Sequence, residues 1–363
     1  MAHAQSLGAH PSAAARTGSV RAWLLTVAAL VFLMVSIGGA TRLTGSGLSI
    51  TEWQPIIGVV PPLSESDWRE AFAKYQQIPQ YHHVNKGMSL EAFKGIFWWE
   101  WAHRFLGRLV GVVFFVPFVV LLALGRIPRS LIPGLAAIFV LGGLQGFVGW
   151  YMVRSGLADR IDVSQYRLAL HLGLAIIIFG ALLWVALSLG APRSAQSAST
   201  TTSRWAACIV ALTFFQILLG ALVAGLKAGM AYNTWPLMDG SLVPKGLGAI
   251  EPWYLNLFEN AMTVQFNHRI VAYALALAVV WHAWSVAQSG DGRARLSAFA
   301  LAAGTVAQAA LGIWTLLAQV PLALALAHQA GAAALFALAV WHLHVTQPRA
   351  DSAAALPPRA GQR

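Results

Sequence analysis

The amino-acid sequence predicts an all-α integral membrane protein with eight transmembrane helices. We expect two tandem four-helix bundles, related by a pseudo-twofold axis along the membrane normal. The chain is 58% hydrophobic and only 10% charged, whereas soluble domains carry about 25% charged residues. Its apolar residues come in blocks of roughly 20, the length that a helix needs to cross a bilayer. The order of several Gly, Gln, Trp and His residues in the first half also recurs in the second half.

Each apolar block is interpreted as one transmembrane helix. The second block is longer than the others, which predicts a helix that is tilted or that starts in the outer interface. The expected spans are 22–41, 97–124, 131–153, 167–189, 205–226, 263–286, 297–319 and 323–345.

The distribution of charge outside the spans predicts the topology. The tails and loops on one side contain many arginines and almost no acidic residue, whereas the opposite loops mix both signs. The arginines of the first side are Arg16, Arg21, Arg126, Arg129, Arg193, Arg204, Arg293, Arg295, Arg349, Arg359 and Arg363. Because cytoplasmic segments carry the excess of positive charge, both termini are expected in the cytoplasm. We expect residues 1–21 and 347–363 to be cytoplasmic tails of a bacterial inner-membrane protein; a mitochondrial inner membrane is the less favoured alternative.

Charge and cysteine content exclude other classes. The net charge of +11 reflects these arginines rather than a nucleic-acid partner, so lipid is the expected surrounding. The single cysteine, Cys208, excludes an intrachain disulfide and any site built from several cysteines.

The internal repeat divides the chain into two halves. Matching residues follow the same order in both halves: Gly38, Gly47 and Trp53 with Gly220, Gly229 and Trp235; His103 and Arg104 with His268 and Arg269; Gln145 and Gly149 with Gln308 and Gly312; and His171 with His328. This order predicts a duplicated four-helix unit. We expect an N-terminal half at 22–189, a linker at 190–204 and a C-terminal half at 205–346. Two long outer loops, 42–96 and 227–262, are equivalent, and the stretch 65–77 is amphipathic enough for a short helix.

Four histidines lie at one predicted depth, within about two turns of the start of their helices. They are His103, His171, His268 and His328. A histidine inside a membrane is costly and is usually functional, and neutral imidazole is a good axial ligand for haem iron. We therefore expect ligation, with His103 paired to His171 and His268 to His328. A polar core residue, a proton relay, and pairing across the halves are the alternatives.

Charged residues beside these histidines suggest how a haem would be held. Arg104, Arg108 and Arg269 could bind haem propionates, because arginine matches a carboxylate in bidentate fashion; the alternative is that they reach the interface. His82 and His83 in the first outer loop are either solvated or in contact with a partner.

Glu100 distinguishes the two halves. It precedes His103 by three positions, so that both project from nearly one helix face, and the second half has Gln265 at this place. A carboxyl can exchange a proton and an amide cannot. The difference predicts a reactive first half and an electron-storing second half; a simple ion pair of Glu100 with Arg104 is the alternative.

Several segments are specific enough to identify a family: Glu91–Arg104, Gly38–Ser49, Thr51–Trp53, Asn233–Met238 and Phe266–Arg269. On these segments, and over roughly residues 20–346, the sequence resembles the haem A synthase family, of the subgroup found in alphaproteobacteria and mitochondria. The resemblance implies oxidation of the C8 methyl group of haem O to a formyl group by successive hydroxylations, which gives haem A for cytochrome oxidase. It also implies that His103 and His171 hold the substrate haem, that Glu100 acts in catalysis, and that His268 and His328 hold a permanent haem b (iron protoporphyrin IX).

The resemblance also suggests partners. Haem O would be the substrate, handed over by a haem O synthase, and the electron donor would be ferredoxin-like or a quinol. A homo-oligomer is compatible with the sequence. Some family members carry a cysteine pair in the first outer loop that this chain lacks, so a mechanism that needs those thiols does not transfer. A cytochrome b that only transfers electrons and a haem transporter are the alternative functions.

Overall fold

The computed structural model of this protein describes residues 13–54, 57–158, 160–190, 199–288 and 291–347. Within these ranges the chain is almost entirely helical, with no β-strand and an isolated bridge between Met238 and Ser241. Eight helices in the described ranges are long and apolar enough to cross a membrane. The chain is therefore a multi-pass membrane protein, and the predicted all-α membrane fold is confirmed.

The eight long helices match the eight predicted spans in order. They are α1 (Ala13–Leu43), α4 (Leu90–Ala123), α5 (Ile132–Leu157), α6 (Gln165–Ser188), α7 (Thr200–Gly225), α9 (Ala261–Ala287), α10 (Gly292–Leu317) and α11 (Leu322–Thr346). The predicted start is too late for α1, α4, α7 and α10. Residues 13–21 of the predicted tail belong to α1, where Val20 is fully buried. The end of the predicted linker belongs to α7, whose first turn is capped by the Ser199 side chain. Parts of the tails and linker, 1–12, 191–198 and 348–363, lie outside the described residues.

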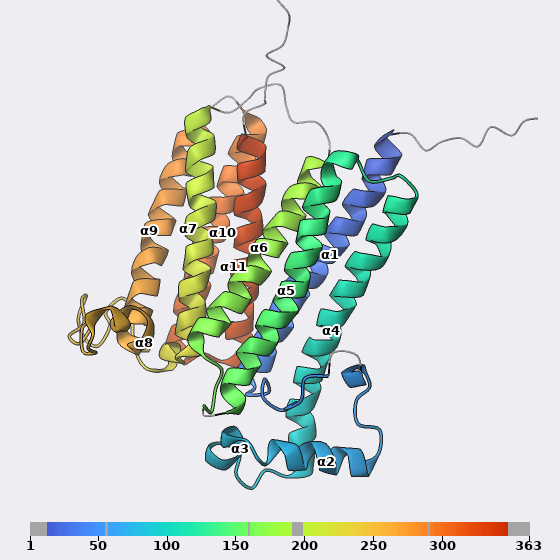
Figure 1. Ribbon diagram of the computed structural model, residues 1–363. Helices are drawn as coiled ribbons and strands as arrows, with labels where there is room; N and C mark the ends of the chain where they lie inside the picture. The colour runs from blue at the N-terminus through green and yellow to red at the C-terminus, as the bar shows by residue number, and fades with distance from the viewer. Residues whose placement is uncertain (1–12, 55–56, 159, 191–198, 289–290, 348–363) are drawn as a thin grey trace, which may run out of the picture.

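The early start of helix α4 changes the position of His103 along its helix. The helix starts at Leu90 rather than at residue 97, because Ser89 caps it and Phe93 and Phe97 pack into an outer aromatic layer. Its first turns therefore project beyond the neighbouring helices (Figure 1). His103 lies more than three turns from the start of α4, so the expectation that it lies within two turns is wrong.

Short helices form a layer at the end of the bundle opposite the start of α1 and the end of α11 (Figure 1). They are α2 (Glu65–Tyr75), α3 (Pro79–His83), α8 (Asn256–Glu259), and the 3₁₀ turns η1 (Ile57–Val59), η3 (Ala228–Met230) and η4 (Trp253–Leu255); a further turn, η2 (Arg129–Leu131), precedes α5. Helix α2 confirms the short helix predicted at 65–77. It begins with a capping box between Ser64 and Asp67, and Tyr75 packs against Phe93 at a ring distance of 5.3 Å.

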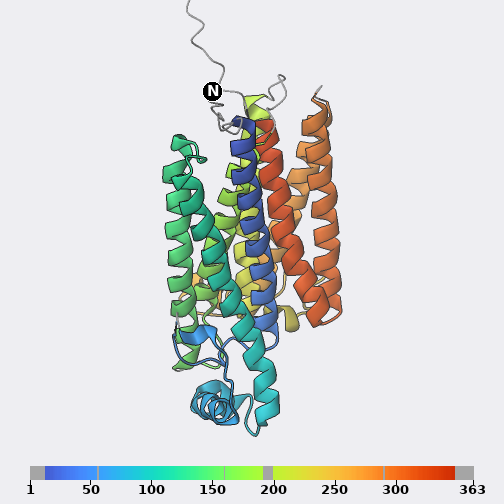
Figure 2. The ribbon, with the colours of Figure 1, turned by 90° about the vertical axis from the view of Figure 1, so that its right-hand side faces the viewer.

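The same pattern of helix contacts occurs twice. In the first set α1 packs on α4 and α6, while α5 contacts α4 and α6; in the second set α7 packs on α9 and α11, while α10 contacts α9 and α11. The sets meet where α6 contacts α7 and α11, and where α1 contacts α11, as Figure 2 shows for α1 and α11. These contacts support the interpretation of the chain as two tandem halves.

Polar contacts also join the two sets of helices. Gln329 Nε2 donates to the Val35 carbonyl at 2.6 Å, and the Tyr166 hydroxyl donates to Glu259 at 2.8 Å. Arg42 donates to the Ala224 carbonyl. An apolar core that includes Val27, Phe179 and Phe336 continues across the seam. The two sets of helices are therefore joined by polar contacts as well as by the apolar core.

Candidate functional site

Each of the four candidate histidines lies against a glycine of a neighbouring helix. A Cβ atom added to Gly38 of α1 would lie 2.8 Å from Cε1 of His103, and one added to Gly149 of α5 would lie 2.9 Å from Cε1 of His171. The second half repeats this packing, with 3.3 Å from Gly220 to His268 and 2.7 Å from Gly312 to His328. Glycine is therefore the residue that leaves room for each ring.

The two histidines of each predicted pair lie on helices of the same set. Helices α4 and α6 carry the first pair, and α9 and α11 the second, so each pair belongs to one set of four helices. This arrangement supports the predicted pairing within the halves.

Glutamine side chains hold three of the four histidines. The amide nitrogens of Gln145, Gln216 and Gln308 donate to the carbonyls of His171, His268 and His328 at 3.0, 2.9 and 2.7 Å. Each nitrogen also lies 3.0–3.2 Å from Nδ1 of the same histidine. Sequence reasoning identified Gln145 and Gln308 as part of the repeat but did not identify their role, and it missed Gln216.

His103 has no such glutamine. The repeat places Gly38 and Gly220 182 residues apart. At the same offset the counterpart of Gln216 in the first half is Met34, which has no amide. Among the described residues, His103 Nδ1 is buried without a hydrogen-bond partner. The first half therefore holds one of its two histidines less firmly than the second half holds either of its own.

These residues fit a haem in each half. A haem brings four nitrogen ligands of its own and needs only axial ligands from the protein, which one pair of imidazoles provides. In the described part of the chain no cluster of three or more His, Cys, Asp or Glu side chains could bind a metal ion without such help. Among the described residues, the oxygens Gln145 Oε1 and Gln216 Oε1 are buried without a hydrogen-bond partner, as is Nδ1 of His103.

Glu100 is buried and fully hydrogen-bonded. Its Oε2 accepts from Ser49 Oγ and from the Ile50 backbone N–H, both at 2.8 Å. Its Oε1 accepts from Arg104 at 2.7 Å through Nη2 and at 3.0 Å through Nε. Glu100 thus forms the ion pair that the sequence offered as an alternative, and it fixes the loop after α1 to α4.

The arginines bind loop carbonyls. Arg104 donates to the carbonyls of Ile50 and Glu52 at 2.7 and 2.9 Å, and Arg269 donates to those of Tyr232 and Thr234 at 2.8 and 2.9 Å. These acceptors occupy equivalent places after α1 and α7. Arg108 donates to the Gln54 carbonyl at 2.9 Å. A role of these three arginines toward haem carboxylates stays a prediction.

The second half builds the same connection with an amide. Gln265 is buried, and its Nε2 donates to the Tyr232 carbonyl at 3.2 Å. Arg269 reaches Gln265 Oε1 at 3.4 Å, and Arg269 Nε is buried without a partner in the part of the chain that the structure describes. The two halves therefore share a scaffold and differ in whether a carboxylate lies within it.

A second histidine pair lies at the other end of the second half, and sequence reasoning missed it. His282 Nε2 and His342 Nε2 are 2.9 Å apart, and Ser297 Oγ lies 2.8 Å from His342 Nδ1. All three are buried. The signal was the spacing, since these histidines follow His268 and His328 by 14 residues on the same helices, about 21 Å along each.

The remaining singled-out residues lie away from these pairs. His82 and His83 are exposed on α3. Cys208 is exposed on α7.

Known proteins share this sequence over most of its length. Residues 21–340 match the COX15-CtaA family model, which is described as cytochrome oxidase assembly protein. A protein of Parvibaculum lavamentivorans named heme A synthase is 58% identical over 89% of this chain and 92% of its own length. Proteins of the same name from a Chelativorans species and from Rhodospirillum centenum are 55% and 53% identical, over 90% and 92% of this chain and 91% and 90% of their own lengths. With the family model matched over nearly all of the spans, the chain belongs to the COX15-CtaA family of cytochrome oxidase assembly proteins.

Proposed function

We propose that the chain is a haem A synthase, an oxidoreductase that converts the C8 methyl group of haem O to the formyl group of haem A for cytochrome oxidase. The observation that carries this proposal is the difference between two otherwise matching histidine sites. Only the first has a buried carboxylate, Glu100, one turn before its histidine. The similarity to proteins named heme A synthase supports the same conclusion.

In this proposal His103 and His171 hold haem O as the substrate, and His268 and His328 hold a resident haem b. Haem b, when bound, supplies one-electron transfer between an electron donor and the substrate site. The glutamines Gln216 and Gln308 position both ligands of the second half in advance, as a site that never exchanges its occupant requires.

Glu100 is proposed as the group that handles protons in the first half. Two successive hydroxylations of the methyl group, followed by loss of water from the resulting gem-diol, produce the formyl group. Of the groups bound to Glu100, the Ser49 hydroxyl is the one that can pass a proton onward, because its oxygen both accepts and donates. Arg104 and the Ile50 N–H keep the carboxylate in place during this exchange.

We also propose that the termini lie in the cytoplasm of a bacterial cell, which places α2, α3 and α8 on the outer side of the inner membrane. This rests on the arginines at the end of the bundle where α1 begins. A cysteine-labelling experiment at residues 3 and 82 would report which end of the protein is accessible from outside.

The proposed activity is tested by extraction of haems. Membranes that contain the protein and a haem O source are extracted, and haem O and haem A are separated and quantified. Haem A is expected. Electron transfer without haem A would instead identify a cytochrome b, and unchanged haem O that crosses the membrane would identify a transporter. In the purified protein, His268→Ala is expected to remove haem b; a retained bis-histidine spectrum would contradict the assignment of that pair.

A further inference from the structure

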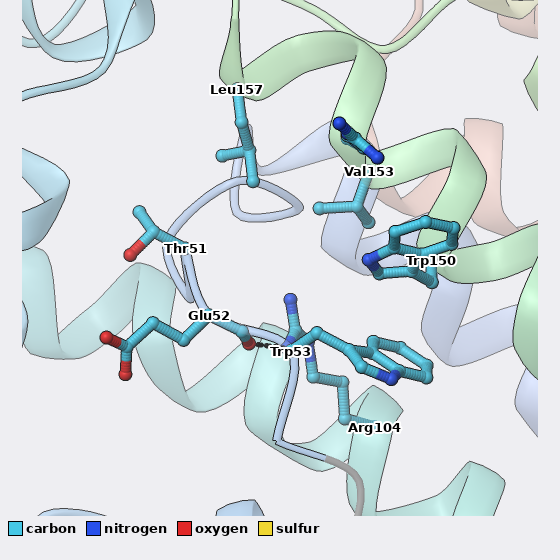
Figure 3. Close-up of a pocket in the computed structure, with 8 residues that line it drawn as sticks. Thr51, Glu52, Trp53, Arg104, Trp150, Val153 and Leu157 are labelled. Atoms are coloured by element: carbon cyan, nitrogen blue, oxygen red, sulfur yellow. Dashed lines mark hydrogen bonds between the residues drawn. The ribbon is translucent and has the colours of Figure 1, made fainter.

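A pocket with a cationic wall lies at the outer end of the first half. Its volume is about 230 Å³, and it is formed by the loop after α1, by α4 and by α5. Figure 3 shows the aromatic side chains Trp53 and Trp150 on one side of it. Their ring centroids are 6.4 Å apart. Arg104 and Arg154 supply the two guanidinium groups of the lining.

The charges around the pocket are unbalanced. Arg104 is paired with Glu100 at 2.7 Å. The Glu52 carboxylate is paired with Lys74 at 2.9 Å and points away from the two tryptophans (Figure 3). Arg154 lies over the Trp150 ring at 5.5 Å, and none of the ion pairs of the described residues includes it. The pocket therefore presents one positive charge that no acidic side chain neutralises.

Two lining residues of the pocket lie next in sequence to residues of the histidine site in the first half. Arg104 follows His103 on α4, and Trp150 follows Gly149, the glycine against which His171 packs. We infer from these neighbours that a molecule held between His103 and His171 extends toward this pocket.

The second half lacks the cation. Gly149 and Gly312 are 163 residues apart, and at this spacing Trp150 and Arg154 correspond to Ile313 and Leu317. Trp53 keeps its counterpart, Trp235. At this pocket the first half carries an ionisable side chain, Arg154, and the second half does not. The same holds for Glu100 and its counterpart Gln265.

We propose that Arg154 binds a carboxylate of the substrate porphyrin, in the pocket between Trp53 and Trp150. This inference rests on the proposed function. A planar guanidinium binds a carboxylate through two parallel hydrogen bonds, and the Trp150 ring beneath it limits its orientations before the ligand arrives. A haem offers two propionates, whereas the rest of the macrocycle is apolar. Arg154 would therefore orient the substrate as well as retain it.

The test compares haem O with its propionate dimethyl ester as ligands of the purified protein, by absorbance titration. For Arg154→Gln we expect haem O to bind about 10-fold to 100-fold more weakly, the loss typical of a charge-assisted hydrogen bond. The ester should bind equally to Arg154→Gln and to the parent protein. Arg154→Lys keeps the charge but loses the planar pair of donors, so its affinity for haem O should lie between that of Arg154→Gln and that of the parent protein. Lys245→Gln is the matched control, because it removes one exposed outer charge from the second half.

Two results would overturn the subsite. One is equal binding of haem O to Arg154→Gln and to the parent protein. The other is an equal loss for haem O and the ester, which would mean that Arg154 acts through packing. Resident haem content reports that each variant is folded, and Arg154 is exposed, so its replacement leaves the core intact. Failure of the proposed function looks different: the parent protein would bind haem O yet make no haem A, while the Arg154 effect on binding remained.

Discussion

Replacing Glu100 by Gln separates its structural role from its chemical role. The carboxylate accepts four hydrogen bonds, two from Ser49 and Ile50 and two from Arg104. Glutamine offers one acceptor oxygen and one donor nitrogen. The two hydrogen bonds to the retained side-chain oxygen can persist. The other two donors would then face the amide NH₂ group of the glutamine.

The cost to stability follows from what Arg104 retains. Removing one partner of a fully buried ion pair costs about 3–5 kcal/mol. Arg104 keeps the carbonyls of Ile50 and Glu52 as acceptors, and its side chain is 16% exposed. The loss should therefore be closer to that of one unsatisfied buried group, about 1–3 kcal/mol. The second half shows that glutamine is compatible with this scaffold, since Gln265 occupies the same place. We expect a folded protein that binds both haems.

Catalysis should suffer far more. Loss of a positioned proton donor or acceptor typically reduces a rate by about 10²-fold to 10⁴-fold. The assay is the ratio of haem A to haem O extracted from membranes, with total bound haem measured on the same sample. Gln265→Glu is the matched control: it gives Arg269 Nε an acceptor and should leave haem A production unchanged. Haem A at the parental level in Glu100→Gln would refute the chemical role, and loss of both haems would refute the stability argument.

Three further predictions test other parts of the structure. In Gly149→Ala the new Cβ would lie 2.9 Å from the His171 ring, so haem bound by the first half should be lost while haem in the second half remains, as absorbance spectra of the purified protein can show. His282→Leu leaves the buried nitrogen of His342 without its partner, which should lower the free energy of unfolding by about 1–3 kcal/mol in thermal unfolding in detergent. The N–H groups of Ser64 and Leu63, with the Ser64 side chain, hold the pKa of Asp67 below its ordinary value of 3.8. The stability that Asp67 gives to α2 is therefore present above pH 3.8 and is lost as the pH falls below it, measurable as faster hydrogen exchange in α2.

Each of these predictions has a control variant or a result that would contradict it. Gly146→Ala adds the same atom on the same helix where nothing lies within 4 Å, and it should keep both haems; equal loss in both variants would show that α5 is merely sensitive to alanine. A His282→Leu protein as stable as the parent would mean that the histidine pair contributes nothing to packing. Asp67→Asn should remove the acid sensitivity of α2, and unchanged sensitivity would assign it to another group.

Hydropathy and the repeat were sufficient to predict the number and order of the spans and to single out the four histidines, because both can be recognised in the sequence without knowledge of the packing. The start of α4 was not predictable in this way. Phe93 and Phe97 pack against an aromatic layer outside the spans, and hydropathy does not report that contact. The buried pair of His282 and His342 was not predicted either. Their contact depends on the rotation of α9 against α11, which hydropathy does not report. The acceptors of Arg104 are backbone carbonyls, and these carry no sequence signal.

The missing amide beside His103 has a consequence for how tightly the two halves hold their ligands. A ring that a neighbouring helix already fixes loses little freedom when a ligand arrives, whereas a ring without a polar partner must be immobilised at that moment, at a cost of about 0.5–1.5 kcal/mol. If both halves bind haems as proposed, the first therefore binds its haem about 2-fold to 10-fold more weakly from this effect alone. Met34 in place of a glutamine would then favour turnover, because a site that must release its product benefits from a histidine whose ring is not fixed before the haem binds.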